Sequence, residues 1–119
     1  MRARLAVFLT LLGTAAWAEA PKAQLTKEGE ALFKKGEAAK KQRNYEAALV
    51  HLERCVKQSP GHYPCYRLLG TVHASLAVRD NSTTEQQKAR EAYEQYVAIA
   101  PADDEYVPKV KVILEQAPR

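Results

Sequence analysis

Residues 29–62 read GEALFKKGEAAKKQRNYEAALVHLERCVKQSPGH, and this stretch decides the fold. Its apolar and small residues recur at steps of three and four, as Leu32 and Gly36 do, which is the spacing of one face of an α-helix. Positions 43–44 interrupt the pattern. Pro60-Gly61 ends it, because proline cannot continue a helix and glycine turns the chain at little cost. The stretch therefore predicts two helices joined by a short turn.

Residues 63–103 repeat the landmarks of the first stretch. The shared landmarks are a large apolar residue, a small residue in each helix, and a closing proline. They are Leu32, Gly36, Ala48 and Pro60 in the first stretch, and Leu69, Gly70, Ala89, Tyr93 and Pro101 in the second. We expect the small residues where two antiparallel helices cross, since a larger side chain there would push the helices apart. The second stretch carries seven extra residues, which we assign to an inserted loop at 78–85.

This pattern resembles the tetratricopeptide repeat, a helical hairpin of about 34 residues with glycine, alanine, aromatic and proline landmarks. The resemblance implies an all-α, helical-hairpin solenoid. Its parts would be an extension at 19–28, repeats at 29–62 and 63–103, and a capping helix with a tail at 104–119. Asp103 and Asp104 suit the start of that last helix, where acids complement the helix dipole. The alternative is an unrelated five-helix bundle with coincidental spacing.

The first 18 residues have the pattern of a secretory signal peptide. Arg2 and Arg4 precede an apolar run at 5–12, and Ala16-Trp17-Ala18 is a small-x-small cleavage site. We expect cleavage after Ala18 and an exported protein, periplasmic or secreted, of the type of the short exported repeat proteins of Gram-negative bacteria. The alternative is an uncleaved anchor, but the run is shorter than the about 20 apolar residues that span a bilayer. No later segment is long or apolar enough to insert into a membrane.

The net charge does not favour a nucleic-acid partner. The chain carries a formal charge of +4, which falls to +2 when Arg2 and Arg4 leave with the signal. Nucleic-acid-binding domains usually carry a strongly basic patch.

Cys55 and Cys65 lie five residues before and five residues after Pro60. In an antiparallel helix pair, residues equally distant from the turn face each other, and an exported protein meets an oxidising compartment. We therefore predict a disulfide; the alternative is two buried small hydrophobic residues. A second alternative is a metal site, because His51 and His62 lie near the two cysteines with ligand-like spacing.

No arrangement of residues points to catalysis or to a cofactor. His73 has no nucleophile or second base spaced to act with it, and the glycines form no phosphate-binding loop. Asn81-Ser82-Thr83 matches the N-glycosylation pattern, but a polar turn in which Thr83 or Thr84 caps the next helix is the simpler interpretation.

The resemblance implies a protein–protein interaction adaptor or scaffold, with its partner in a cell-envelope assembly. Stacked repeats bind peptides on a face lined by the first helix of each hairpin. The residues expected on that face are Phe33, Glu37, Lys40, Arg67 and Thr71. The alternatives are a metal-binding or enzyme-accessory protein that uses His51, Cys55, His62 and Cys65, and a structural homo-oligomer.

Overall fold

The computed structural model describes residues 20–117, and the predicted signal peptide at 1–18 lies outside them. The described part of the chain is all α-helical. Its helices are α2 (Lys27–Lys41), α3 (Tyr45–Gln58), α4 (Tyr63–Asp80), α5 (Thr83–Ile99) and α6 (Val107–Gln116). None of the described helices is long and apolar enough to span a bilayer.

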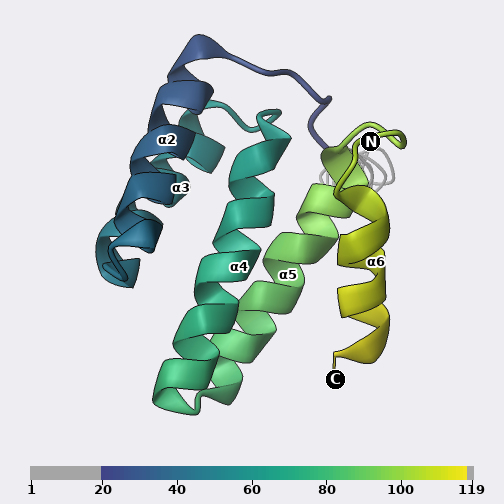
Figure 1. The fold of residues 1–119 in the computed structure, drawn as a ribbon. Helices are drawn as coiled ribbons and strands as arrows, with labels where there is room; N and C mark the ends of the chain where they lie inside the picture. The colour runs from purple at the N-terminus through teal and green to yellow at the C-terminus, as the bar shows by residue number, and fades with distance from the viewer. Residues whose placement is uncertain (1–19, 118–119) are drawn as a thin grey trace, which may run out of the picture.

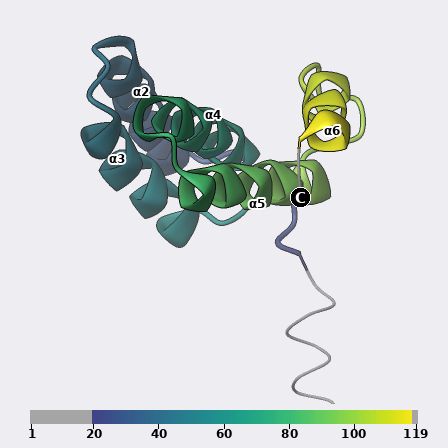
Figure 2. The same ribbon diagram turned by 90° about the horizontal axis from the view of Figure 1, so that it is seen from below.

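The helices form two stacked hairpins and a final helix (Figure 1). α2 pairs with α3, α4 pairs with α5, and α4 also packs against both helices of the first hairpin. α6 packs on α5. Seen end-on, α2, α4 and α6 form one layer, while α3 and α5 form the other (Figure 2). This is the helical-hairpin repeat fold that the sequence predicts.

Three helices begin at a side chain that accepts a hydrogen bond from the backbone N–H three residues on. Thr26 caps α2 at 2.9 Å, Asn44 caps α3 at 3.2 Å and Ser82 caps α5 at 3.1 Å. Such caps satisfy backbone donors that would otherwise lack a partner at a helix start. They fix where α2, α3 and α5 begin.

In each hairpin, the two helices approach each other closely at a glycine of the first helix. A Cβ atom on Gly36 would lie 2.7 Å from Cγ of Leu52 in α3, and one on Gly70 would lie 2.6 Å from the ring of Tyr93 in α5. Leu52 is fully buried and Tyr93 nearly so. The two hairpins therefore repeat the same close approach of helices, each across a glycine.

The predicted loop at 78–85 is wrong. α4 continues to Asp80, α5 begins at Thr83, and only Asn81 and Ser82 connect them. Asn81 turns the chain in the left-handed region with φ of 50°, and the cap is Ser82, not Thr83 or Thr84. The extra residues lengthen both helices, because a turn added to each of two antiparallel helices at the same end leaves their packing in phase.

The last helix also begins later than expected. α6 starts at Val107 with Tyr106 before it, so Asp103 and Asp104 lie in the preceding turns. The Asp104 carboxylate accepts hydrogen bonds from the Tyr96 hydroxyl of α5 and from the backbone N–H of Tyr106. A buried hydroxyl that needs an acceptor holds this carboxylate more firmly than the dipole of a short helix would.

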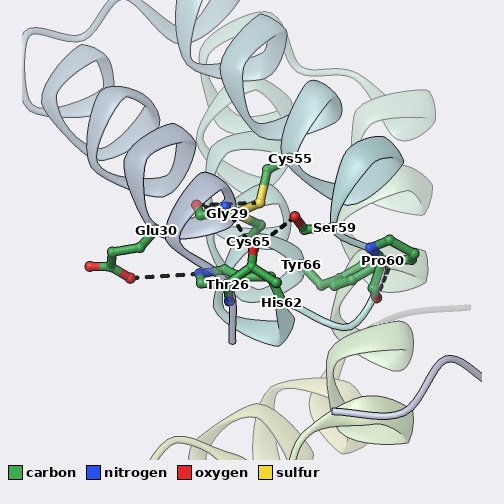
Figure 3. Close-up of a disulfide and its surroundings, with 9 residues drawn as sticks. All are labelled: Thr26, Gly29, Glu30, Cys55, Ser59, Pro60, His62, Cys65 and Tyr66. Carbon is green, nitrogen blue, oxygen red and sulfur yellow. Dashed lines mark hydrogen bonds and ion pairs between the residues drawn. A yellow bond between two sulfur atoms is a disulfide. The ribbon is translucent and has the colours of Figure 1, made fainter. Parts of the chain in front are cut away.

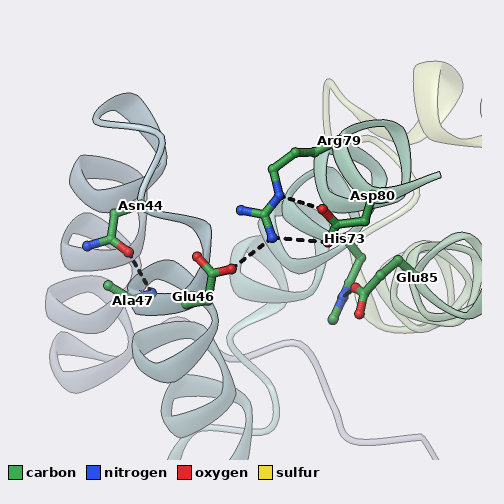
Figure 4. A network of polar contacts seen from close by, with 7 residues as sticks. All are labelled: Asn44, Glu46, Ala47, His73, Arg79, Asp80 and Glu85. Carbon is green, nitrogen blue, oxygen red and sulfur yellow. Dashed lines mark hydrogen bonds and ion pairs between the residues drawn. The ribbon is translucent and has the colours of Figure 1, made fainter. Parts of the chain in front are cut away.

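Polar contacts link the lengthened end of α4 to its neighbours (Figure 4). Arg79 donates to Glu46 at the start of α3 at 2.9 Å and to Asp80 at 2.8 Å. Hydrogen bonds to Arg79 lower the pKa of both carboxyls. The Nδ1 atom of His73 lies 2.6 Å from the Glu85 carboxylate in α5. His73 is thus a buried residue with a satisfied ring nitrogen.

Candidate partner-binding face

The layer of α2, α4 and α6 carries the predicted binding residues, and we call its open side the α2–α4–α6 face. All five predicted residues are half-buried on it: Phe33, Glu37, Lys40, Arg67 and Thr71. Cavities hollow this face on both sides of α4, which forms a ridge at Ala74 and Val78.

The structure brings Phe33 and Arg67 together through a stack of side chains. The guanidinium carbon of Arg67 lies 3.9 Å from the ring centre of Tyr106 and 6.0 Å from that of Phe33. A guanidinium over an aromatic ring is attracted by the electrons of the ring face and keeps its N–H groups free to donate at its edge. Within residues 20–117, no carboxylate forms an ion pair with Arg67.

A small cavity of about 190 Å³ opens beside this stack. Four of its lining residues are aromatic, and Arg67, Asp104 and Glu30 supply the charged groups. Its lining includes Phe33, Tyr63, Arg67, Tyr96, Asp104 and Tyr106. The arrangement joins aromatic rings to one cation and two carboxylates, which is a lining suited to a polar side chain or a chain end rather than to a large cofactor.

Two tyrosine hydroxyls at this cavity stay protonated. Burial raises the pKa of Tyr96, and the hydrogen bond to Asp104 raises it further. Burial also raises the pKa of Tyr63, with smaller contributions from Asp104 and Asp103. At neutral pH both groups are therefore hydrogen-bond donors, not bases.

The Thr71 side chain links the two helices of the second hairpin by hydrogen bonding. Its hydroxyl donates to the backbone carbonyl of Arg67 at 3.2 Å and lies 3.1 Å from the Tyr93 hydroxyl. Glu37 and Lys40, by contrast, are brought to the face without a hydrogen bond or ion pair in the described residues. They remain open to a partner.

A larger hollow, the α4–α6 channel, lies between α4 and α6 with α5 as its floor. Its volume is about 470 Å³, and its wall residues are mostly apolar: Ala74, Ala77, Val78, Ala89, Ile113 and Leu114. The backbones of α2 and α4 pack against each other, whereas those of α4 and α6 lie farther apart. Val78 is 85% exposed and Ile113 is 42% exposed, so the channel presents apolar side chains to solvent.

The cysteines form the predicted disulfide (Figure 3). Cys55 in α3 and Cys65 in α4 are bonded with their Cα atoms 6.4 Å apart. The bond contradicts the alternative of a metal site at His51, Cys55, His62 and Cys65, because bonded sulfurs cannot act as thiolate ligands. Among residues 20–117 no cluster of histidine, cysteine and carboxylate residues is placed to hold a metal ion.

The sequence did not predict Tyr106, Tyr63 and Asp104, which line the small cavity beside Arg67. Arg67 and Tyr106 are 39 positions apart, and no helical period links them. A partial signal exists for Tyr106, which directly precedes the apolar stripe of the last helix at Val107 and Val110. It does not reveal that the ring turns toward α4.

Comparison with known proteins supports the first hairpin directly. Residues 30–62, which include most of α2 and all of α3, match the family model of the tetratricopeptide repeat. No curated protein and no solved structure matches the chain. The second hairpin lies outside the match, and its likeness to the first rests on the shared Gly36–Leu52 and Gly70–Tyr93 contacts. Repeats of this family generally mediate protein–protein interaction.

Proposed function

We propose that this chain is an exported, non-enzymatic adaptor of a cell-envelope assembly, which binds a segment of a partner protein on its α2–α4–α6 face. One observation carries the proposal. The face combines a half-buried arginine without a carboxylate partner in the described residues, stacked between aromatic rings, with an exposed apolar channel next to it. Exposed apolar surface of this kind usually marks a site of interaction.

The two parts of the face suit different parts of a bound segment. The rings of Phe33 and Tyr106 offer apolar area, and the edge of the Arg67 guanidinium offers N–H donors to a carboxylate or a backbone carbonyl. The α4–α6 channel offers small and branched side chains to an apolar stretch. The partner segment is therefore expected to join a hydrogen-bond acceptor to apolar side chains.

Substitutions on the face should weaken partner binding while the fold survives. Phe33→Ala removes apolar area worth up to about 2–3 kcal/mol when a partner buries it. Arg67→Glu reverses the charge at the cavity and removes the stack on Tyr106, which costs about 1 kcal/mol of fold stability at a partly exposed site. Co-purification from the native envelope, with circular dichroism of each variant, measures both effects.

Matched controls come from α3, which lies in the other layer. Val50→Ala and Arg54→Glu make the same kinds of change at exposed positions there, and they should leave binding unchanged. If Phe33→Ala unfolds the protein, Phe33 belongs to the core and its place in the binding site is wrong. If binding is lost in the α3 variants and kept in the face variants, the partner uses the opposite layer.

Export is supported by the basic, apolar and small-residue pattern of residues 1–18. A disulfide fits this proposal, because such bonds persist in oxidising compartments outside the cytosol. We expect the mature protein in the envelope or medium to begin at Glu19. N-terminal sequencing of fractionated cells measures this, and an intact Met1 on protein confined to the cytosol would contradict it.

A further inference from the structure

Residues 22–26, which we call the N-terminal strap, lie across the turn at 59–62 that joins the two hairpins. The backbone N–H of Gln24 donates to the Gly61 carbonyl at 2.8 Å. The Thr26 hydroxyl lies 2.8 Å from that of Ser59, and the Thr26 N–H donates to Nδ1 of His62 at 3.1 Å. Thr26, Ser59 and His62 converge in Figure 3. The strap is thus tied to the turn by hydrogen bonds and not by apolar packing.

His62 is enclosed by these contacts, with 1% of its surface exposed. Its ring lies against the backbone of Gly29, where a Cβ atom would come within 2.5 Å of the ring. Because Nδ1 accepts a hydrogen bond, the ring proton sits on Nε2. Nε2 has no hydrogen-bond partner in the described residues, and its nearest charged neighbour is the Glu30 carboxylate at 3.6 Å.

The disulfide lies directly behind this histidine. Cys55 and Cys65 are fully buried, and the Gly29 carbonyl oxygen lies 3.6 Å from one sulfur and 3.8 Å from the other. The Gly29 N–H in turn donates to the Thr26 hydroxyl. The first turn of α2 therefore covers the bond, and the strap holds this turn through Thr26. Opening of the strap and this turn together would give a reductant access to the sulfurs.

We propose that protonation of His62 releases the strap and exposes the disulfide, so that the bond is shielded at neutral pH and open to reductants in acid. A second ring proton would sit on Nδ1, where it would face the Thr26 N–H. Two donors would then point at each other in a buried site, and the strap would lose its bond to the ring. This costs more free energy than the loss of a contact, because the N–H of Thr26 and the Nδ1–H of His62 would both be removed from water without a hydrogen-bond acceptor.

The groups around His62 set the direction of the response. Burial lowers the pKa of His62, and the Glu30 carboxylate of α2 opposes this. The other groups near it, which are the bonded cysteines of α3 and α4 and the Ser59 hydroxyl at the end of α3, carry no charge at neutral pH. The closed state binds the proton less well than the open state, so opening rises as pH falls below the ordinary histidine pKa of about 6.5.

The rate at which a water-soluble phosphine reduces the disulfide tests the proposal. The phosphine gives two electrons to the bond and becomes the phosphine oxide with oxygen from water, and the sulfurs leave as two thiols. Thiol release is measured from about pH 7.5 to about pH 5 on folded protein, relative to an exposed model disulfide. We expect the relative rate to rise by up to about tenfold for each pH unit below about 6.5.

Three variants test whether His62 causes the effect. In His62→Asn the amide oxygen can still accept the Thr26 N–H but does not titrate, so the rate should not vary with pH. His51→Asn, a half-buried histidine on α3, should keep the wild-type profile. Glu30→Gln removes the carboxylate that favours protonation of the closed state, so the rise should begin at the same pH but continue to a lower pH and reach a larger total increase. The Glu30→Gln variant tests the role of His62 protonation even if His62→Asn does not fold.

Amide hydrogen exchange separates strap release from general unfolding. In acid the N–H groups of Gln24 and Thr26 should lose protection while those of the core around Leu52 keep it. A reduction rate without pH dependence in the wild type, or an unchanged profile in Glu30→Gln, would overturn the proposal. So would reduction in acid while Gln24 and Thr26 stay protected.

Discussion

Reduction of the Cys55–Cys65 disulfide should lower the free energy of unfolding by roughly 2–3 kcal/mol. The bond closes a loop over a sequence separation of 10, and in the chain-entropy model a crosslink of that span removes this much freedom from the unfolded chain. Folded-state losses should be small, because each reduced thiol would find the Gly29 carbonyl within reach as an acceptor. For a domain of this size the melting temperature should fall by about 10–20 °C.

Denaturant unfolding of oxidised and fully reduced protein at neutral pH measures this difference. The double variant Cys55→Ala and Cys65→Ala should have a lower free energy of unfolding than the reduced protein, because it also leaves a cavity in the core. Adding reductant to that variant is the control and should change nothing. Equal unfolding midpoints for oxidised and reduced protein would show that the crosslink does not stabilise the fold.

The second large effect is expected from Gly36→Leu, which should destabilise the protein by about 1–3 kcal/mol or more. Even the first added atom would lie 2.7 Å from Leu52, closer than carbon atoms approach without movement. Leu52 is fully buried and packed among the core residues of both hairpins, so it has no space to move into. The two helices of the first hairpin would have to separate.

A second leucine variant on the same helix separates the effect of packing from that of helix propensity. Leucine has a higher helix propensity than glycine, by somewhat less than about 1 kcal/mol. A loss of stability in Gly36→Leu would therefore come from packing and not from propensity. Ala38→Leu places the same side chain at an exposed position of α2 and should be nearly neutral. Thermal unfolding of both variants gives the comparison. A Gly36→Leu protein as stable as Ala38→Leu would mean that the helices do not meet at this glycine.

The landmarks of a single hairpin are local, and the sequence determined them. Leu32, Gly36 and Leu52 lie at helical spacing on either side of a short turn, so their meeting follows once both helices form. The placement of Cys55 and Cys65 about Pro60 likewise predicted their bond, because two helices leaving one turn keep equidistant residues opposite each other. These contacts depend only on helix geometry and on one reversal of the chain.

The tertiary structure decided the rest. The residues at 78–85 contain no strong breaker, so their spacing allows a loop or two longer helices, and packing of α4 on α5 selects the helices. Arg67 meets Tyr106, and Thr26 meets His62, across 39 and 36 positions. Such contacts depend on the angle at which whole hairpins stack and on where the chain enters and leaves them. That angle is set by buried side chains from several helices at once, and no single period in the sequence encodes it.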